Sequence, residues 1–178
     1  MGDFIVCFIY ACVIGALSNF VAASMDRKWF QPDLWLFRCR SWEREGRFYR
    51  SLHVQQWKDK LPDMSKIFPK FLTPKQVDST MGANQVHQVV EETCKAEAVH
   101  WGLSAACGMF FLLCKTWKNA LVLWLIYFLV FNLPFIIIQR FNRPRLVRLE
   151  QRLRGDQSHG FPPLKESARA AYCDKATR

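Results

Sequence analysis

Three long stretches of this sequence, residues 4–24, 98–114 and 120–138, contain no Lys, Arg, Asp or Glu. A helix needs roughly 17–25 mostly apolar residues to cross the core of a bilayer, and each stretch meets that requirement. The rest of the chain has no amphipathic helix long enough to cover three rods that are apolar on every side, which argues against a soluble bundle. The sequence therefore predicts an all-α membrane protein with three transmembrane helices.

Basic residues are absent before the first stretch, although the chain holds 25 Lys and Arg. Thirteen lie in residues 25–97, two in the turn at 115–119 and ten after residue 138. Lys and Arg gather in cytoplasmic loops, so the N-terminus and the 115–119 turn are predicted outside the cell membrane. Residues 25–97 and the C-terminus are predicted in the cytoplasm. An N-terminus without Lys or Arg is also atypical of a signal peptide, so residues 4–24 are predicted to stay as a helix.

Paired cysteine motifs are lacking as well. None of the seven cysteines forms a CxxC pair, so neither a zinc finger nor a disulfide framework is indicated. A Glu-x-x-His motif occurs once, at Glu97 and His100, whereas a di-iron carboxylate bundle requires two copies.

The remaining segments divide the chain into one membrane domain, residues 1–154, and a mobile cytoplasmic tail, residues 155–178. Within the domain, residues 34–57 are rich in aromatics and arginine, with Trp35, Trp42 and Tyr49 spaced seven residues apart. This pattern is typical of an amphipathic helix lying in the cytoplasmic membrane interface. Three prolines between residues 61 and 80 predict a loop, and residues 85–100 predict a helix that continues into the second span.

Arginines interleaved with aromatics also occur in nucleic-acid-binding proteins. In a membrane-bound chain, attraction to anionic lipid accounts for the same composition. The expected partner of this surface is therefore the bilayer and not a nucleic acid, and the sequence leaves open a homo-oligomer.

Glu97 and His100 lie three residues apart and project from one face of the predicted helix. A carboxylate beside an imidazole fixes the ring and its tautomer, which suits a general base. Two other interpretations stay open at this point. The pair could form a salt bridge at headgroup level, or, together with Glu92, it could hold a metal ion.

The end of the third span carries NLPFIIIQRFNRPR, residues 132–145. Pro134 cannot donate to the carbonyl of Val130, which predicts a kink or local unwinding, and Asn132 needs a partner inside the apolar core. Pro144 is expected to stop the helix. Arg140, Arg143 and Arg145 either anchor the helix to anionic lipid or bind phosphate through the forked geometry of the guanidinium group.

Three pieces of sequence, QQWKDKLPD (55–63), ETCKAEAVHW (92–101) and NLPFIIIQRFNRPRL (132–146), resemble the glycosyl-4,4′-diaponeurosporenoate acyltransferase family over roughly residues 25–150. The last piece is the most specific, and Phe141 replaces a tyrosine of the family pattern. The resemblance implies transfer of a fatty acyl group to a sugar hydroxyl of a membrane glycolipid, in staphyloxanthin-type carotenoid synthesis. The matching positions are Trp57, Lys58, Lys60, Glu92, Glu97, His100, Asn132, Gln139, Arg140, Asn142, Arg143 and Arg145.

The leading hypothesis is a membrane O-acyltransferase that uses a cytoplasmic donor such as acyl-CoA and a glycolipid acceptor, without a cofactor or metal. His100, Glu97, Glu92 and Asn132 are the predicted catalytic residues. The other matching positions are predicted to bind substrate, with the arginines and Lys58 or Lys60 holding the donor's phosphates. Two alternatives remain: a metal-dependent lipid enzyme that uses Glu92, Glu97 and His100, and a non-catalytic lipid-binding membrane subunit.

Overall fold

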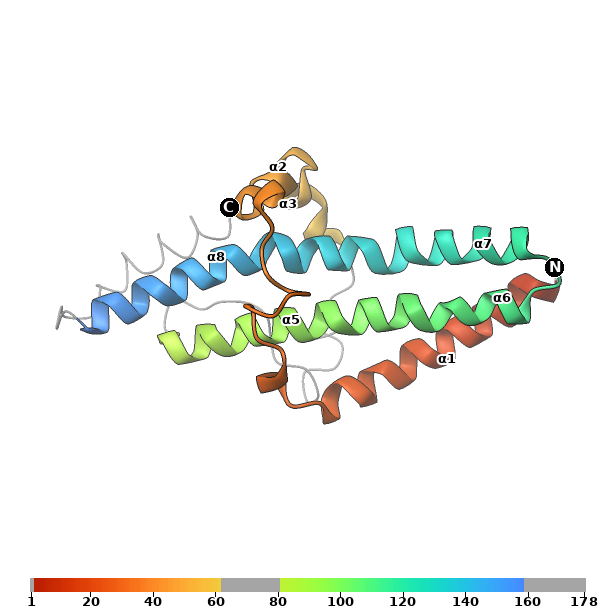
Figure 1. Ribbon diagram of the computed structural model, residues 1–178, viewed down its shortest axis with the longest axis horizontal. Coiled ribbons are helices and arrows are strands. Elements are labelled where there is room, and N and C mark those ends of the chain that lie inside the picture. The colour runs from red at the N-terminus through yellow and green to blue at the C-terminus, as the bar shows by residue number, and fades with distance from the viewer. Residues whose placement is uncertain (1, 62–80, 159–178) are drawn as a thin grey trace. The chain divides into compact units, whose positions relative to one another are not determined.

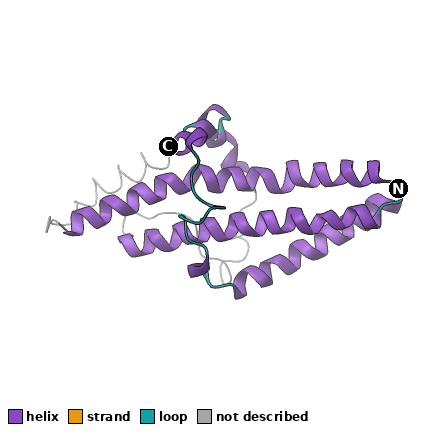
Figure 2. Ribbon diagram, viewed as in Figure 1, coloured by secondary structure: helices purple, strands orange, loops and turns teal. Residues whose placement is uncertain are grey.

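Helices account for the regular structure of the part of the chain that the computed structural model describes, residues 2–61 and 81–158, and no strand occurs in it (Figures 1 and 2). The long helical runs are α1 (Gly2–Ser24), α5 (Ala83–Ala106) with η4 (Cys107–Met109) and α6 (Phe110–Leu113), and α7 (Trp117–Ile126) with η5 (Tyr127–Asn132) and α8 (Leu133–Ser158).

Within these described ranges, three helices are long and apolar enough to cross a membrane: Gly2–Ser24, Ala83–Leu113 and Trp117–Gly155. Each covers one of the three uncharged stretches, the second as far as Leu113, so the three spans predicted from the sequence are confirmed. The second helix begins at Ala83, well before the uncharged stretch, which also confirms the helix expected at residues 85–100.

The third run contains one departure from α-helical geometry. Residues Tyr127–Asn132 form a π-helical turn directly before Pro134. Proline has no N–H and its ring crowds the carbonyl four residues earlier, so the preceding turn widens. The local unwinding predicted from Pro134 is confirmed.

Pro144, in contrast, does not end the helix, because α8 continues through it to Ser158. The expectation of a stop at Pro144 is wrong. The first residues of the predicted tail, 155–158, are helical, and the rest of that tail and the loop expected at 62–80 lie outside the described residues.

Residues 34–57 do not form the single amphipathic helix that the sevenfold spacing predicts. They fold as short helical segments: η2 (Ser41–Gly46), α2 (Phe48–Ser51) and α3 (Val54–Trp57), followed by η3 (Lys58–Lys60); a further turn, η1 (Arg27–Trp29), precedes them. Backbone φ angles are positive at Arg44, Glu45, Gly46 and His53, and these left-handed residues break the helix. Trp35 and Trp42 are nonetheless exposed, as interfacial aromatics are, while Tyr49 is buried.

The chain forms two compact units, whose boundaries fall within α5 and within α8. The first unit comprises Met1–Asp26 and Lys95–Ile137, and its core packs Cys7 against Cys107, Phe110 and Ala120. The second comprises Arg27–Cys94 and Ile138–Arg178. Its core pairs Ala83 and Val86 of α5 with Leu149 and Leu153 of α8.

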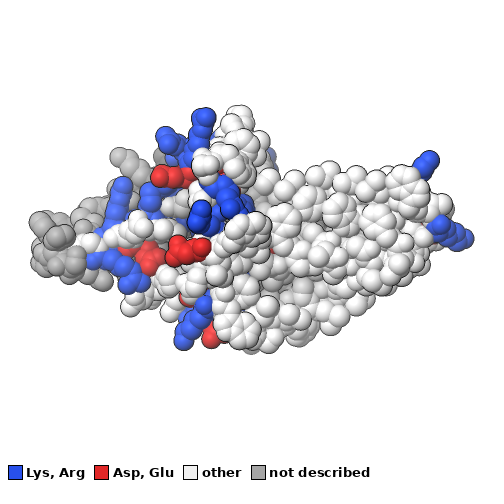
Figure 3. All heavy atoms as spheres, in the orientation of Figure 1, with Lys and Arg blue, Asp and Glu red and all other residues white. Residues whose placement is uncertain are grey.

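Charge separates the two units. On the face shown in Figure 3, Lys, Arg, Asp and Glu gather over the short helices α2 and α3 and the second half of α8. The surfaces of α1, α6 and α7 are uncharged except at the end where α6 and α7 meet. An uncharged surface belongs to hydrocarbon and a charged one to water or headgroups. We call the two parts the apolar unit and the charged unit.

Candidate functional site

In the apolar unit, His100 of α5 faces Asn132 at the end of the π-helical turn. Its Nδ1 atom lies 3.1 Å from Asn132 Oδ1, and its ring stacks on Phe135 with centroids 4.9 Å apart and planes within 7°. The other end of the Asn132 amide, Nδ2, donates to the carbonyl of Tyr127 at 3.4 Å. The pair thus joins a ring on one helix to a carbonyl of the turn on another.

These contacts define the tautomer of the neutral ring. A backbone carbonyl only accepts hydrogen bonds, so the Asn132 amide must turn its NH₂ group toward Tyr127 and its oxygen toward His100. Because that oxygen also only accepts, Nδ1 of His100 carries the hydrogen. The lone pair of the neutral imidazole is then on Nε2, which makes Nε2 the basic atom.

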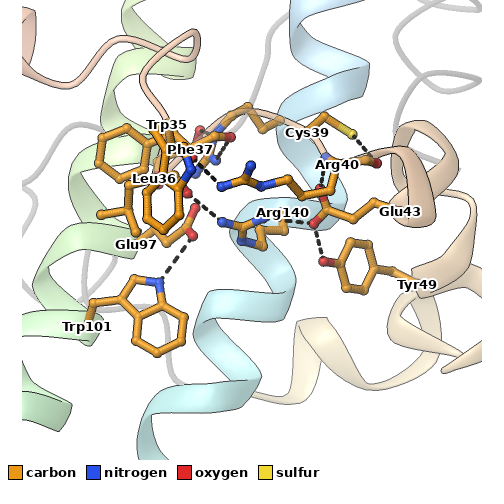
Figure 4. A network of polar contacts seen from close by, with 12 residues as sticks. Trp35, Leu36, Phe37, Cys39, Arg40, Glu43, Tyr49, Glu97, Trp101 and Arg140 are labelled. Carbon is orange, nitrogen blue, oxygen red and sulfur yellow. Dashed lines mark hydrogen bonds and ion pairs between the residues drawn. The ribbon is translucent and has the colours of Figure 1, made fainter.

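Glu97, one turn before His100, is fully buried. Its Oε1 accepts a hydrogen bond of 3.2 Å from Nε1 of Trp101 (Figure 4). The predicted role of Glu97, orienting His100, stays a prediction. Glu92 is half-buried on the same helix. No cluster of three or more His, Cys, Asp or Glu that could hold a metal occurs within residues 2–61 and 81–158, so Glu92, Glu97 and His100 do not converge as metal ligands.

In the charged unit, the Arg140 guanidinium lies between Glu43 and the carbonyl of Leu36 (Figure 4). Nη1 donates to Glu43 Oε1 at 2.9 Å, and Nη2 donates to Leu36 O at 2.5 Å. Glu43 also accepts from the hydroxyl of Tyr49 and from the backbone N–H of Arg40. Burial alone would raise the pKa of Glu43, but the bonds from Tyr49, Arg40 and Arg140 outweigh it and lower that pKa.

Arg143 is buried and uses all three of its side-chain nitrogens on protein acceptors. Nε donates to Thr93 Oγ1 at 3.1 Å, Nη2 to Thr93 O at 3.1 Å, and Nη1 to Phe37 O at 2.8 Å. The guanidinium also lies over the ring of Phe37, 5.5 Å from its centroid. Arg143 thereby ties α8 to α5 and to the segment before η2 within the charged unit.

The remaining predicted substrate-binding residues are spread over the charged unit. Arg145 is buried against the ring of Phe141, with its guanidinium carbon 3.8 Å from the centroid, and the Lys58 ammonium lies 5.9 Å from the same centroid. Gln139 is buried, Asn142 and Trp57 are half-buried, and Lys60 is exposed. Phe141 thus gives two of the predicted cations a common aromatic surface.

A pocket of about 300 Å³ opens in the charged unit, with four arginines in its lining: Arg38, Arg140, Arg143 and Arg148. Glu43 and Glu45 also line it, and Arg148 pairs with Glu45 at 2.8 Å. Neither Arg38 nor Arg148 is among the site residues predicted from the sequence. Each lies in a basic stretch of the sequence, and the spacing within that stretch does not show which arginine lines a pocket. Only the fold, which brings the two together, distinguishes them.

The sequence model of the glycosyl-4,4′-diaponeurosporenoate acyltransferase family matches residues 26–152, which include every predicted site residue. Proteins named glycosyl-4,4′-diaponeurosporenoate acyltransferase from Staphylococcus aureus strains N315 and USA300 are 25% identical over 144 residues, covering 80% of this chain and 85% of each relative. The homologue from strain MRSA252 is 26% identical over the same coverage. No solved structure matches the chain. The chain belongs to the glycosyl-4,4′-diaponeurosporenoate acyltransferase family, and its enzyme class is acyltransferase.

Proposed function

We propose that the protein is a membrane O-acyltransferase that moves a fatty acyl group from a cytoplasmic donor such as acyl-CoA to a hydroxyl of a membrane glycolipid. The family name supports an acceptor of the glycosylated carotenoid type. The observation that carries the proposal is the contact between His100 Nδ1 and Asn132 Oδ1, because it leaves the basic nitrogen of a fixed imidazole on Nε2.

In this mechanism, Nε2 of His100 removes the proton from the acceptor hydroxyl as the oxygen attacks the acyl carbonyl. The new C–O ester bond forms, the C–S bond of the thioester breaks, and the thiolate takes the proton from the imidazolium. A positioned base of this kind contributes on the order of 10²–10⁴ in rate. Asn132 acts as a positioning residue, and Glu97 supports the helix face that presents the ring. Glu92, also on α5, is a further candidate catalytic residue.

For the donor, we propose that the arginine-lined pocket holds phosphate groups. Arg140 and Arg143 already bond to protein acceptors, so they shape its wall. Arg38 is exposed, and Arg148 lies at the surface in a pair with Glu45. Arg38 is therefore placed to bind phosphate oxygens, and Arg148 to exchange Glu45 for them. Lys58, Lys60 and Arg145, with Trp57, Gln139 and Asn142, complete the proposed substrate-binding set.

The orientation belongs to the same proposal. We place the N-terminus and the turn between α6 and α7 outside the cell membrane and residues 25–97 in the cytoplasm, since Lys and Arg concentrate in that segment. Single cysteines at positions 60 and 117 of a cysteine-free variant should then label from opposite sides with an impermeant maleimide. Labelling of both from one side would contradict this orientation.

The function is tested by lipid profiling of cells that contain or lack the protein. Cells with the wild-type protein should contain a glycolipid heavier by one acyl chain. With purified protein, His100→Ala should lower the initial rate of acyl transfer by a factor on the order of 10²–10⁴. His53→Asn is the matched control. His53 is exposed with φ 52°, a conformation that asparagine adopts readily. Unchanged turnover in His100→Ala would rule out His100 as the general base. Loss of activity in chelator and recovery with metal would favour the metal-dependent alternative, and absence of any acylated species would favour a non-catalytic subunit.

A further inference from the structure

Two cysteines far apart in the sequence meet in the apolar unit. Sγ of Cys7 on α1 lies 3.4 Å from Sγ of Cys114, which directly follows α6. Cys7 is 2% exposed and Cys114 is half-buried. Two thiols at this distance need to approach by only about 1.4 Å to reach the length of a disulfide bond.

Independent contacts hold α1 beside the segments on either side of α6. One turn before Cys7, Asp3 Oδ2 accepts hydrogen bonds from the backbone N–H of Lys115 and from Nδ2 of Asn119, both at 3.2 Å. On the other side of Cys7, the hydroxyl of Tyr10 donates to the carbonyl of Ala106 at 3.1 Å. Cys7 and Cys114 therefore lie between two fixed points, and Figure 1 shows α1 beginning at the same end as the turn between α6 and α7.

We propose that Cys7 and Cys114 form a disulfide bond that ties α1 to the end of α6. The proposed orientation places this end of the helices outside the cytoplasm, where disulfides form and persist. The oxidant is the disulfide of an extracytoplasmic thiol oxidase. The thiolate of Cys114, the more exposed partner, attacks that disulfide and gives a mixed disulfide, which Cys7 resolves. The S–S bond between Cys7 and Cys114 forms, the disulfide of the oxidase breaks, and the two thiol protons pass to its sulfurs, which leaves the oxidase as a dithiol.

The bond is independent of the acyl transfer reaction, because it needs only the orientation and the geometry of α1 and α6. Its expected effect is structural, since α1 becomes covalently attached to the rest of the apolar unit. Closing a loop of this length removes conformational freedom from the unfolded chain. The oxidised protein should therefore melt at a higher temperature than the reduced protein.

The test begins with membranes dissolved in SDS with an excess of N-ethylmaleimide, which blocks every free thiol, including those of the buried Cys94 and Cys107. The protein is then reduced and labelled with a polyethylene-glycol maleimide, which adds a gel shift for each thiol that was in a disulfide. Wild type should show two shifts, and Cys7→Ser and Cys114→Ser should each show none. Cys12→Ser, an exposed cysteine of the same helix, is the control and should keep both shifts.

Mass spectrometry of non-reduced wild-type protein provides a reading that does not depend on any variant folding. A linked peptide pair containing Cys7 and Cys114 supports the bond. Complete alkylation of both cysteines in the native membrane, with no linked pair, overturns it. Acyl transfer by the fully reduced protein would leave the proposed function intact, so the two proposals can fail separately.

Discussion

Nδ1 of His100 lies 3.1 Å from Oδ1 of Asn132, and the same amide donates to the carbonyl of Tyr127. A backbone carbonyl in a π-helical turn thus determines which nitrogen of a ring on another helix carries the hydrogen. Pro134 widens the turn, and Asn132 connects a carbonyl of that turn to Nδ1 of His100. The lone pair of the neutral ring is consequently on Nε2. Pro134, Asn132 and His100 together define the tautomer of one imidazole ring.

Asn132→Leu should lower kcat with little change in the KM for the donor, because the side chain positions His100 and does not hold the acyl chain. Loss of one net hydrogen bond predicts a decrease of about tenfold. Asn132→Asp keeps an acceptor for Nδ1 and should recover activity. The new carboxylate favours imidazolium, so its pH–rate profile should move to higher pH. An Asn132→Asp profile that coincides with that of the wild type would contradict the positioning role.

Arg143→Lys should destabilise the charged unit more than it weakens donor binding. A lysine ammonium cannot reach Thr93 Oγ1, Thr93 O and Phe37 O together, and each buried acceptor left unsatisfied costs about 1–3 kcal/mol. The melting temperature in detergent should fall clearly. Arg154→Lys provides the control, because Arg154 makes an exposed pair with Glu150 on the same helix. A normal melting temperature with a raised KM for the donor would instead assign Arg143 to phosphate binding.

The network around Glu43 predicts a loss of stability in acid. Its pKa is lowered from the ordinary value of 4.5, so its stabilisation is complete above that pH and is lost as the pH falls through the native pKa. Glu43→Gln should therefore lower the melting temperature strongly at pH 7. The difference from wild type should shrink below pH 4.5. Glu45→Gln, at a side chain 70% exposed, should change the melting temperature little at either pH. If the difference in melting temperature between Glu43→Gln and wild type is the same at every pH, protonation of Glu43 does not cause the loss of stability in acid.

Gly46→Ala should destabilise the protein. Gly46 has φ 86°, and an added Cβ would lie 3.3 Å from the carbonyl oxygen of Phe141, a backbone atom that cannot rotate away. The left-handed conformation alone costs about 1–2 kcal/mol with a Cβ. Gly102→Ala is the matched control: a Cβ added at Gly102 in α5 would meet nothing within 4 Å, and alanine favours a helix by roughly 0.5–1 kcal/mol. Equal melting temperatures for the two variants would show that η2 rearranges freely.

The spans were predictable because their signal is local. An uncharged run of sufficient length predicts a membrane environment by itself, and Pro134 predicts a disturbance in the turn that precedes it. The interfacial segment was different. Sevenfold spacing placed Tyr49 with Trp35 and Trp42, yet Tyr49 turns inward to donate to Glu43. Left-handed conformations at Arg44 and Glu45 cause this reversal. Neither arginine nor glutamate is a residue type that predicts a left-handed conformation.

The arginines show the same limit for the candidate site. Arg140, Arg143 and Arg145 are equivalent in the sequence as a basic cluster at a helix end. The fold gives them separate surroundings: a carboxylate for Arg140, three oxygens of α5 and the Phe37 segment for Arg143, and an aromatic ring for Arg145. Which acceptors a guanidinium meets depends on segments 50 to 106 residues away in the chain, as the Thr93 and Phe37 contacts of Arg143 illustrate. Spacing within one helix carries no information about them.

The π-helical turn has a consequence for the tolerance of the chain to changes in length. Each residue of an α-helix advances the side-chain direction by about 100°, and a π-helical turn accommodates about one residue more than an α-helical turn over nearly the same rotation. Deleting one residue between Tyr127 and Asn132 would therefore let the segment close into a continuous α-helix, while the residues that follow would keep nearly their present direction. Inserting a further residue there would instead rotate Asn132 by about 100° away from His100. The protein should therefore tolerate the deletion better than the insertion, which should be as damaging as the loss of Asn132 itself.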